Sequence, residues 1–311
     1  MNDPKVHILL STYNGSNYIL EQLDSIFQQT YQNFTLFIRD DGSSDNTLAL
    51  IDQYKEQHPE YTSKINILPN LSNSNLGYME SFWTLLQKCG NADIYSFCDQ
   101  DDVWLPDKLM QGVKFLTAHD NSLPLLYFSS FYLCNEDLSQ RSPAPQVSLP
   151  IGFKDVLFYT PAFGFSIMIN ECLRNTALKI SDRRNLPHDG WMQKLAAAFG
   201  KILYDPTPTA YYRRHGLAVT TENQSTRSLI RNWISHDILG SSMSETHYVI
   251  SRFYQEYASS VSEENQKILK LFGTDQKGLI IWWKRLTYRP HLRPTAGGRL
   301  ALKICFFLNR Y

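Results

Sequence analysis

The sequence predicts an α/β protein in which a mainly parallel, Rossmann-like sheet is flanked by helices and followed by a helical C-terminal extension. Two observations carry this prediction. Over the first hundred or so residues, short apolar runs alternate with segments of helical periodicity, and polar residues follow the end of each run. With 311 residues, 43% of them hydrophobic and 19% charged, the chain can bury a core, which excludes the disordered and low-complexity classes.

Four apolar runs, each bounded by polar or turn residues, are expected to be buried strands: residues 6–11, 34–40, 65–68 and 94–99. Three amphipathic patterns lie between them, with apolar positions Ile19, Leu23, Ile26 and Phe27, then Leu48, Ile51 and Tyr54, then Met79, Phe82, Trp83 and Leu86. Strands that alternate with helices form a parallel sheet. Right-handed crossovers then place the carboxyl end of every strand at one edge, where open α/β sheets bind ligands.

The pattern changes after about residue 215, where helical periodicity dominates. Such segments cover residues 229–239, 248–257 and 268–272, and a polar loop at 220–225 precedes them. We therefore predict two domains, an α/β domain over residues 1–220 and a helical region over residues 221–311.

Charge and cysteine content limit the classes of partner and compartment. Lys plus Arg and Asp plus Glu both number 30, so no net field favours wholesale nucleic-acid binding. The cysteines form no CxxC pair and are odd in number, which is typical of buried thiols in a reducing compartment: Cys89, Cys98, Cys134, Cys172 and Cys305. Residues 1–10 do not have the pattern expected of a signal peptide, and no stretch has 18 uninterrupted apolar residues. We expect a cytoplasmic protein.

Three carboxylates crowd the segment Asp99-Gln100-Asp101-Asp102, directly after the fourth apolar run. Like charges so close are costly unless a cation or solvent compensates them, and a divalent cation such as Mn²⁺ or Mg²⁺ prefers oxygen ligands. The alternative is a solvated acidic turn that caps a helix beginning near Pro106. Because the segment stands at a strand end, we favour the metal.

A second acidic pair, Asp40-Asp41, follows the second apolar run and begins the segment DDGSSDNT, residues 40–47. Its carboxylates could accept hydrogen bonds from a nucleobase or a ribose. The alternative is a plain strand-turn-helix junction, with N-cap residues for the helix that starts near Thr47. Neither GxGxxG nor GxxxxGK[ST] is present, which argues against a classical dehydrogenase and a P-loop ATPase.

Two further segments carry groups suited to chemistry. Asp189, in His188-Asp189-Gly190-Trp191, stands at the start of a helical pattern, where an aspartate could also be an ordinary N-cap. The segment at residues 211–216 offers the imidazole of His215 as a metal ligand and the guanidinium groups of Arg213 and Arg214 for phosphate; the alternative is a plain basic turn.

Six motifs in this order resemble the family 2 glycosyltransferases with the GT-A fold: STYNG at 11–15, DDGSSDNT at 40–47, NLG at 75–77, DQDD at 99–102, HDGW at 188–191 and YRRHG at 212–216. More narrowly, the sequence is similar to bacterial rhamnosyltransferases that build cell-wall and surface polysaccharides. The resemblance covers residues 5–216.

The resemblance implies a role for each matching residue. It assigns to the nucleotide-sugar donor Thr12, Tyr13, Asp40, Asp41, Asn75, Gly77, Asp99 and Arg213. It assigns Asp99 and Asp101 to a DxD motif that holds the metal and the donor diphosphate, with His215 completing the metal shell. Asp189 matches the catalytic base. Asp102 matches no role, and Gly190 departs from the second tryptophan that related rhamnosyltransferases often have.

The activity implied is an inverting, metal-dependent transfer of L-rhamnose from dTDP-L-rhamnose to a hydroxyl of a lipid-linked saccharide. A UDP-hexose-dependent galactosyl- or glucosyltransferase is the sibling alternative. A nucleotidyltransferase and a non-catalytic sugar-nucleotide-binding module are alternatives from other classes. The first would be expected to have a glycine-rich and basic phosphate loop, which residues 11–15 lack.

The C-terminal tail, residues 277–311, contains eight Lys or Arg residues and no Asp or Glu, interleaved with aromatic residues. Cationic and aromatic side chains together favour the anionic inner face of the cell membrane. We therefore expect peripheral membrane association. The alternative is a solvated basic face whose aromatic stripe covers the core or forms a homodimer.

Overall fold

The computed structural model describes residues 3–70, 75–214, 235, 240–276 and 278–311. The chain forms two compact units. The first comprises Met1–Val147, Ala162–Ala196 and Gly200–Ala218, and the second Ser148–Pro161, Ala197–Phe199 and Val219–Tyr311. The domain division that we predict at residue 220 falls outside the described residues, so it stays a prediction.

The first unit contains the predicted parallel strands β1 (Val6–Thr12), β2 (Phe34–Asp40), β3 (Ile65–Leu68) and β4 (Ile94–Cys98). They are hydrogen-bonded in the order β3-β2-β1-β4, and Val6 lies opposite both Phe34 and Ile94. Their carboxyl ends therefore share one edge, as the alternating pattern predicts.

The other strands extend the sheet in the order β4-β8-β6-β9-β5. They are β5 (Val103–Trp104), β6 (Leu125–Cys134), β8 (Ile167–Asn170) and β9 (Lys201–Arg213), and β7 (Arg141–Pro143) pairs with β6. Strand β8 is antiparallel to both neighbours, whereas β9 is parallel to β6. The sheet is thus mainly parallel, with the antiparallel strand β8 inserted in it and the short strands β5 and β7 also antiparallel to their neighbours.

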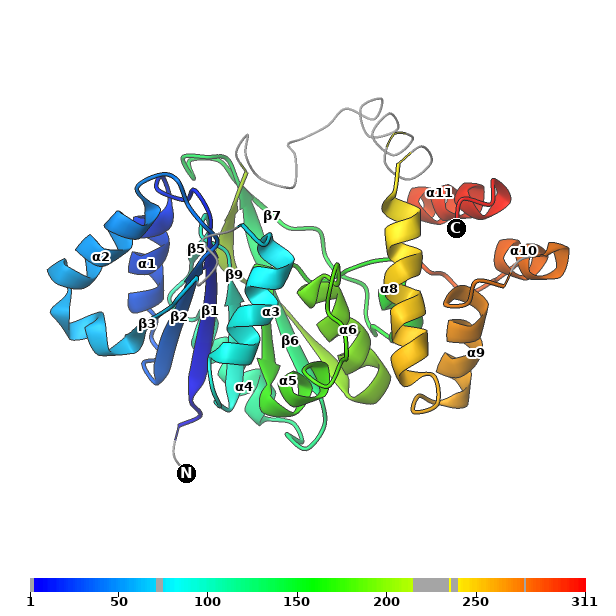
Figure 1. The fold of residues 1–311 in the computed structure, drawn as a ribbon, viewed down its shortest axis with the longest axis horizontal. Helices are drawn as coiled ribbons and strands as arrows, with labels where there is room; N and C mark the ends of the chain where they lie inside the picture. The colour runs from blue at the N-terminus through cyan, green and yellow to red at the C-terminus, as the bar shows by residue number, and fades with distance from the viewer. Residues whose placement is uncertain (1–2, 71–74, 215–234, 236–239, 277) are drawn as a thin grey trace. The chain divides into compact units, whose positions relative to one another are not determined.

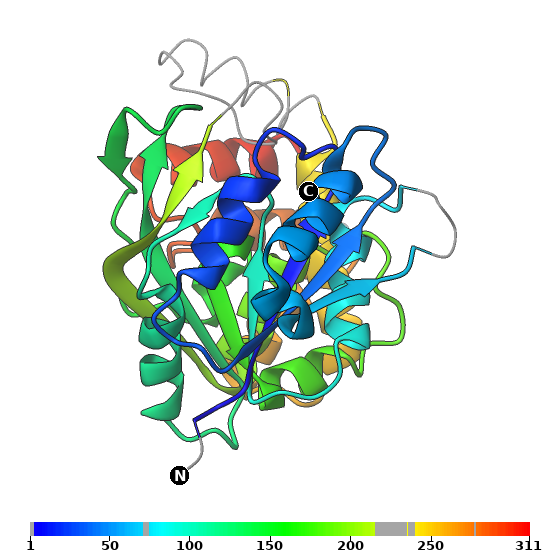
Figure 2. The ribbon, with the colours of Figure 1, turned by 90° about the vertical axis from the view of Figure 1, so that its left-hand side faces the viewer.

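Helices flank this sheet (Figures 1 and 2). They are α1 (Ile19–Phe27), α2 (Thr47–Gln57), α3 (Tyr78–Lys88), α4 (Lys108–Thr117), α5 (Glu171–Ala177) and α6 (His188–Phe199), with short 3₁₀ turns η1 (Pro59–Lys64) and η3 (Gly164–Ser166). The predicted apolar face of α1 is buried, which removes Ile19, Leu23 and Ile26 from water. Leu48 of α2 is exposed instead of buried, whereas Thr47, Ile51 and Tyr54 of the same helix are buried.

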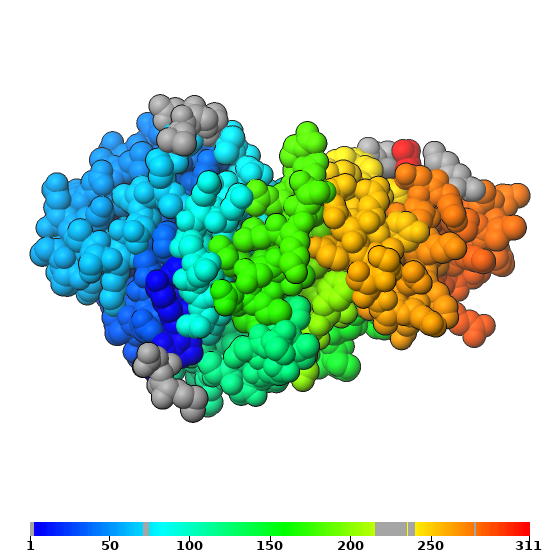
Figure 3. Space-filling view, turned by 60° about the horizontal axis from the view of Figure 1, so that its bottom comes forward, coloured from blue at the N-terminus to red at the C-terminus, as the bar shows by residue number. Residues whose placement is uncertain are grey.

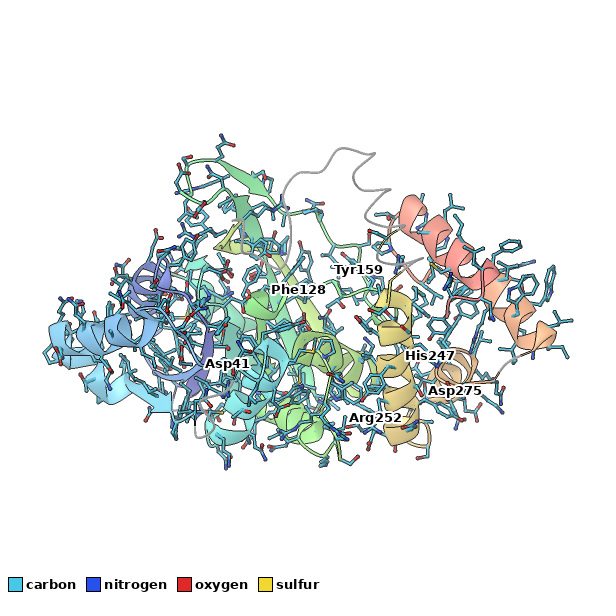
Figure 4. All side chains as sticks on the ribbon, turned by 45° about the horizontal axis from the view of Figure 1, so that its top comes forward. Asp41, Phe128, Tyr159, His247, Arg252 and Asp275 are labelled. Atoms are coloured by element: carbon cyan, nitrogen blue, oxygen red, sulfur yellow. The ribbon has the colours of Figure 1, made fainter. Side chains whose placement is uncertain are left out.

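The second unit is helical, as predicted. It contains η2 (Phe153–Val156), α8 (Ser242–Tyr257), α9 (Glu263–Phe272), α10 (Leu279–Leu286) and α11 (Ala296–Phe307). Helices α8 and α9 are the yellow and orange segments of Figure 3, and in Figure 4 His247 of α8 lies beside Asp275, whose carboxylate is 3.0 Å from its Nε2. The predicted helical pattern at 229–239 falls outside the described residues, apart from residue 235.

All five cysteines are free thiols, and four are buried, as expected; Cys172 is half-buried. Within the described part of the chain, no helix is both long and apolar enough to cross a bilayer.

Candidate active site at the carboxyl edge of the sheet

The loops after β1 and β4 are joined by one side chain, Gln100. Its Oε1 accepts from the Tyr13 amide at 2.8 Å and its Nε2 donates to the Tyr13 carbonyl at 2.9 Å. Gly15 leaves room for this side chain, because a Cβ at that position would lie 2.1 Å from Gln100 Oε1 and would displace it. Gln100 was not among the predicted site residues. Its place inside the acidic segment, facing a glycine 85 residues away in sequence, left no local signal.

The Asp40 carboxylate has four protein donors. Its Oδ1 accepts from the Thr12 hydroxyl at 2.8 Å and the Ser43 hydroxyl at 2.6 Å. Its Oδ2 accepts from the amides of Gly42 at 3.1 Å and Ser43 at 2.8 Å. A carboxylate accepts about four hydrogen bonds. Asp40 therefore organises the loop after β2, and in this arrangement its lone pairs are already used.

Asp41 also has protein donors, three in number. Its carboxylate pairs with Arg39 at 2.7 Å and accepts from the amides of Leu76 at 2.9 Å and Gly77 at 2.7 Å. Asn75 Oδ1 also accepts from the Gly77 amide, and Gly77 has φ of +82°, a conformation that favours glycine. The fold thus brings the predicted donor-binding residues of the second and third loops together.

Asp99, in the loop after β4, differs from Asp40 and Asp41 in its surroundings. The Asp99 carboxylate receives no hydrogen bond from the described residues. Burial first, and then the charges of Asp101 and Asp189, raise its pKa to about 7. Asp189, on α6, therefore lies within electrostatic reach of the DQDD segment, although 90 residues separate Asp99 and Asp189 in sequence. A cation at this edge would relieve the charge repulsion.

Asp102 lies inside the protein. It is buried, its Oδ1 accepts from the Arg213 amide at 3.2 Å, and its Oδ2 has no partner among the described residues. Burial first, and then the charges of Asp101 and Asp99, raise its pKa well above the usual range. Lys108, also buried, has its pKa lowered to about 8 by burial. The burial of Asp102 and of Lys108 was not predicted from the sequence.

Arg213 fastens the acidic loop to its surroundings. Its buried guanidinium donates from Nε to the Asp101 carbonyl at 2.9 Å, and its other nitrogens contact the Glu136 carbonyl and the Glu21 carboxylate. It also lies over the Tyr18 ring, 5.0 Å from its centroid. These contacts position the loop, so contact of Arg213 with donor phosphate stays a prediction. His215 falls outside the described residues.

Asp189 is the second residue of α6, and Pro187 occupies the N-cap position. Its Oδ1 accepts from the next amide, that of Gly190, at 2.7 Å. The N-cap alternative for Asp189 is therefore wrong. Burial lowers the pKa of the neighbouring His188 to about 4 and that of Lys194 to about 8, and the charge of Asp189 opposes both shifts.

The residues present fit a divalent cation. Carboxylate oxygens are the ligands that Mn²⁺ and Mg²⁺ prefer, and Asp99 lies close enough to Asp101 and Asp189 for their charges to act on it. Among the described residues, no three His, Cys, Asp or Glu side chains gather as a complete metal site. A donor diphosphate and residues outside this set would have to supply the remaining ligands.

The sequence model of Glycosyl transferase family 2 matches residues 7–173, more than half of the chain. The protein belongs to this family and is a glycosyltransferase. The nucleotidyltransferase and the non-catalytic binding module are therefore not retained.

Two relatives illustrate the range of the family. The dTDP-rhamnosyl transferase RfbG of Shigella flexneri is 29% identical over 215 residues, which cover 66% of this chain and 71% of that protein. The UDP-Glc:alpha-D-GlcNAc-diphosphoundecaprenol beta-1,3-glucosyltransferase WfgD of Escherichia coli is 27% identical over 146 residues, which cover 47% of this chain and 53% of that protein.

Solved structures confirm the fold. TarS of S. aureus, in complex with UDP-GlcNAc, superposes with a TM-score of 0.57 at 15% identity, over 99% of this chain and 93% of that one. The mannosyltransferase PcManGT of Pyrobaculum calidifontis, in complex with GDP-Man and Mn²⁺, superposes with a TM-score of 0.53 at 15% identity, over 100% and 89%. The predicted GT-A fold is confirmed.

Proposed function

We propose that this glycosyltransferase catalyses an inverting, metal-dependent transfer of a sugar from a nucleoside diphosphate to an acceptor hydroxyl. One observation carries the proposal: the charges of Asp101 and Asp189 both act on the Asp99 carboxylate. This supports our proposal that groups from the strand-end loop and from α6 form one acidic site, where a diphosphate and a base are both needed.

In this mechanism Asp189 accepts the proton of the acceptor hydroxyl, whose oxygen attacks the anomeric carbon as the bond to the diphosphate breaks. Asp99 and Asp101 would hold Mn²⁺ or Mg²⁺, which neutralises charge on the departing diphosphate when bound. Arg213 keeps the acidic loop in place through the Asp101 carbonyl. Thr12, Tyr13, Asp40, Asp41, Asn75 and Gly77 would shape the nucleotide pocket, and His215 would complete the metal shell.

The proposed donor is dTDP-L-rhamnose, and the support for it is the similarity to RfbG, which extends over two thirds of the chain. A UDP-hexose is the second candidate, supported by the similarity to WfgD. The two donors carry different nucleotides, so the nucleoside diphosphate that is released, dTDP or UDP, tells them apart.

A donor panel tests both candidates. Purified protein with Mn²⁺ or Mg²⁺ is incubated with dTDP-L-rhamnose, UDP-glucose and UDP-galactose, and the released nucleoside diphosphate is measured. We expect release of dTDP and its loss on addition of a chelator. Release of UDP alone would replace rhamnose by a hexose, and release that is unaffected by the chelator would contradict the metal.

The proposed acceptor is a lipid-linked saccharide in polysaccharide synthesis, reached by a protein docked on an anionic membrane. Helix α10 exposes 83% of Leu279, 72% of Ile280 and 58% of Trp283, beside the exposed Lys284. Arg285 and Lys303 donate to backbone carbonyls instead, so only part of the tail's charge is available to lipid. Apolar and cationic groups on one surface favour an anionic bilayer.

Liposome co-sedimentation tests the docking with the full chain. We expect binding to anionic but not to zwitterionic vesicles, and loss of binding in a triple variant with Leu279→Ser, Ile280→Ser and Trp283→Ser. Leu20→Ser, which alters an exposed leucine of α1, is the matched control. Equal partitioning of all three proteins would reject the membrane and leave the homodimer, which the oligomeric state in solution would test.

A further inference from the structure

Four aromatic rings form a cluster in the first unit: Phe131, Phe163, Phe165 and Tyr212. The Phe163 centroid lies 5.4 Å from that of Phe131 and 5.9 Å from that of Tyr212, and Phe165 stacks on Tyr212 at 5.0 Å. Phe131 and Phe165 are 6% and 1% exposed, whereas Phe163 is 40% exposed. Phe163 therefore presents an open aromatic surface backed by a packed cluster.

The cluster stands at the edge of the sheet that carries the acidic site. Strand β8 is antiparallel to β4, with Met168 opposite Ser96, so the residues just before β8 lie beyond the carboxyl end of β4. Phe163 is among them, and Asp99 follows that same strand end. On the other side of the cluster, Tyr212 immediately precedes Arg213, which holds the Asp101 carbonyl.

Phe163 is also tied to the helix of the proposed base. Gln193 of α6 accepts from the Ala162 amide at 3.1 Å and donates from Nε2 to the Ala162 carbonyl at 2.9 Å. The same Nε2 lies 3.1 Å from the Asp189 carbonyl. After Phe163, the Ser166 hydroxyl and amide hold the Phe163 carbonyl at 2.8 and 2.9 Å. The ring is therefore held by backbone anchors on both sides.

An exposed ring whose backbone is held next to the strand end that precedes Asp99 and to the helix that carries Asp189 has the chemistry of a saccharide subsite. The face of an aromatic ring carries partial negative charge and attracts the C–H groups that line one face of a pyranose. The hydroxyls at the rim of the sugar remain free to bind polar groups of the protein. Small-molecule sites commonly combine an apolar surface with a few such polar contacts.

We propose that Phe163 is the stacking platform for the acceptor saccharide. The inference rests on the proposed function, because Asp189 defines where the acceptor hydroxyl must lie. The ring would align the sugar so that one hydroxyl faces Asp189, while the donor remains on the side of Asp99 and Asp101. Phe163 is thus a positioning and specificity-determining residue for the acceptor, distinct from the donor site.

A binding measurement that needs no turnover tests the stacking. Saturation-transfer NMR is recorded with methyl α-L-rhamnoside and methyl β-D-glucoside as probes, in the presence of dTDP and the diamagnetic ion Mg²⁺. We expect transfer to the C–H protons of at least one probe, a loss of about tenfold in affinity with Phe163→Ala, and recovery with Phe163→Trp. Tyr248→Ala, which removes a similarly exposed ring from α8, is the control.

Kinetics on the full chain separate the two sugars. With Phe163→Ala we expect the acceptor KM to rise about tenfold while the donor KM and acceptor-free donor hydrolysis stay at wild-type values. An unchanged acceptor KM, or a donor KM that rises instead, would overturn the inference. If the probes bind through Phe163 but no nucleoside diphosphate is ever released, the proposed function fails and the saccharide subsite stands.

Discussion

The two acidic pairs at the carboxyl edge of the sheet differ in what surrounds them. Asp40 and Asp41 receive hydrogen bonds from hydroxyls, backbone amides and Arg39, which satisfy a buried carboxylate. Asp99 receives none from the described residues and has its pKa raised by burial and by two other acids. The first pair is built into the fold by hydrogen bonds, whereas the Asp99 carboxylate has like charges as neighbours and no hydrogen-bond donor among the described residues.

This difference shows where chemistry is expected. A carboxylate whose oxygens already accept several hydrogen bonds stabilises a loop, because these donors offset its charge. A crowded and undercompensated one costs stability until a cation or proton arrives, which is typical of functional sites. Substitutions at the two regions should therefore fail in different ways, one in folding and the other in turnover.

The largest effect is expected at the proposed base. Asp189→Asn keeps the shape of the side chain but removes its basicity, so kcat should fall roughly 10²- to 10⁴-fold while donor binding is spared. Steady-state kinetics and nucleotide titration measure the two quantities. Asp52→Asn, on the exposed face of α2, is the control. Wild-type turnover of Asp189→Asn would remove this residue from the mechanism.

Asp41→Asn should act on folding. It leaves the buried Arg39 guanidinium without its charge partner, so the free energy of unfolding should fall by about 3 kcal/mol. Urea unfolding followed by circular dichroism measures the change. A variant as stable as the wild type, with a donor KM that rises sharply, would show that Asp41 serves the nucleotide directly and would reverse the comparison.

Asp101→Asn should act on turnover instead. We expect activity to fall about 10²-fold and the donor KM to rise, because charge on the departing diphosphate is less well neutralised. Stability should not fall, since one negative charge leaves a crowded acidic site. A loss of several kcal/mol in the unfolding experiment, with kinetics unchanged, would show that the two acidic regions do not differ as described.

The smallest effect concerns a buried ionisable group outside both pairs. His7 is buried between Phe37 and Tyr95 with both ring nitrogens unpartnered among the described residues, and burial lowers its pKa to about 4. The unfolded chain binds a proton near pH 6.5 and the folded chain only near pH 4, so stability falls as the pH drops through this window. At pH 5 the loss is about 2 kcal/mol.

His7→Phe should abolish this part of the acid sensitivity. The expected result is a smaller fall in the free energy of unfolding between pH 7.5 and pH 5 than in the wild type. Equal falls in both proteins would mean that His7 is protonated in the folded state.

The sequence predicted the parallel half of the fold because its signal is local. Each of β1 to β4 is an apolar run followed by polar residues, and the helices between them repeat every three to four residues. Strands β5 to β9 were not predicted, since the antiparallel β8 and the long β9 depend on pairings with distant residues, such as Tyr127 with Leu203.

The site was predicted unevenly for the same reason. Motif resemblance found Asp99, Asp101 and Asp189, and the fold brings them within electrostatic reach. It gave no account of Gln100, of the Arg39 pair with Asp41, or of Arg213 as an anchor for the loop. These contacts join residues far apart or depend on burial, neither of which one segment of sequence reveals.

Binding of Mn²⁺ tests the central contrast between the two regions most directly. Electron paramagnetic resonance can follow free Mn²⁺ during titration with and without dTDP, for the wild type, Asp189→Asn and Asp101→Asn. We predict that dTDP tightens Mn²⁺ binding at least about tenfold in the wild type and in Asp189→Asn, and leaves it weak in Asp101→Asn. Wild-type binding of both Mn²⁺ and dTDP by Asp101→Asn would contradict the assignment of the diphosphate to this acidic edge.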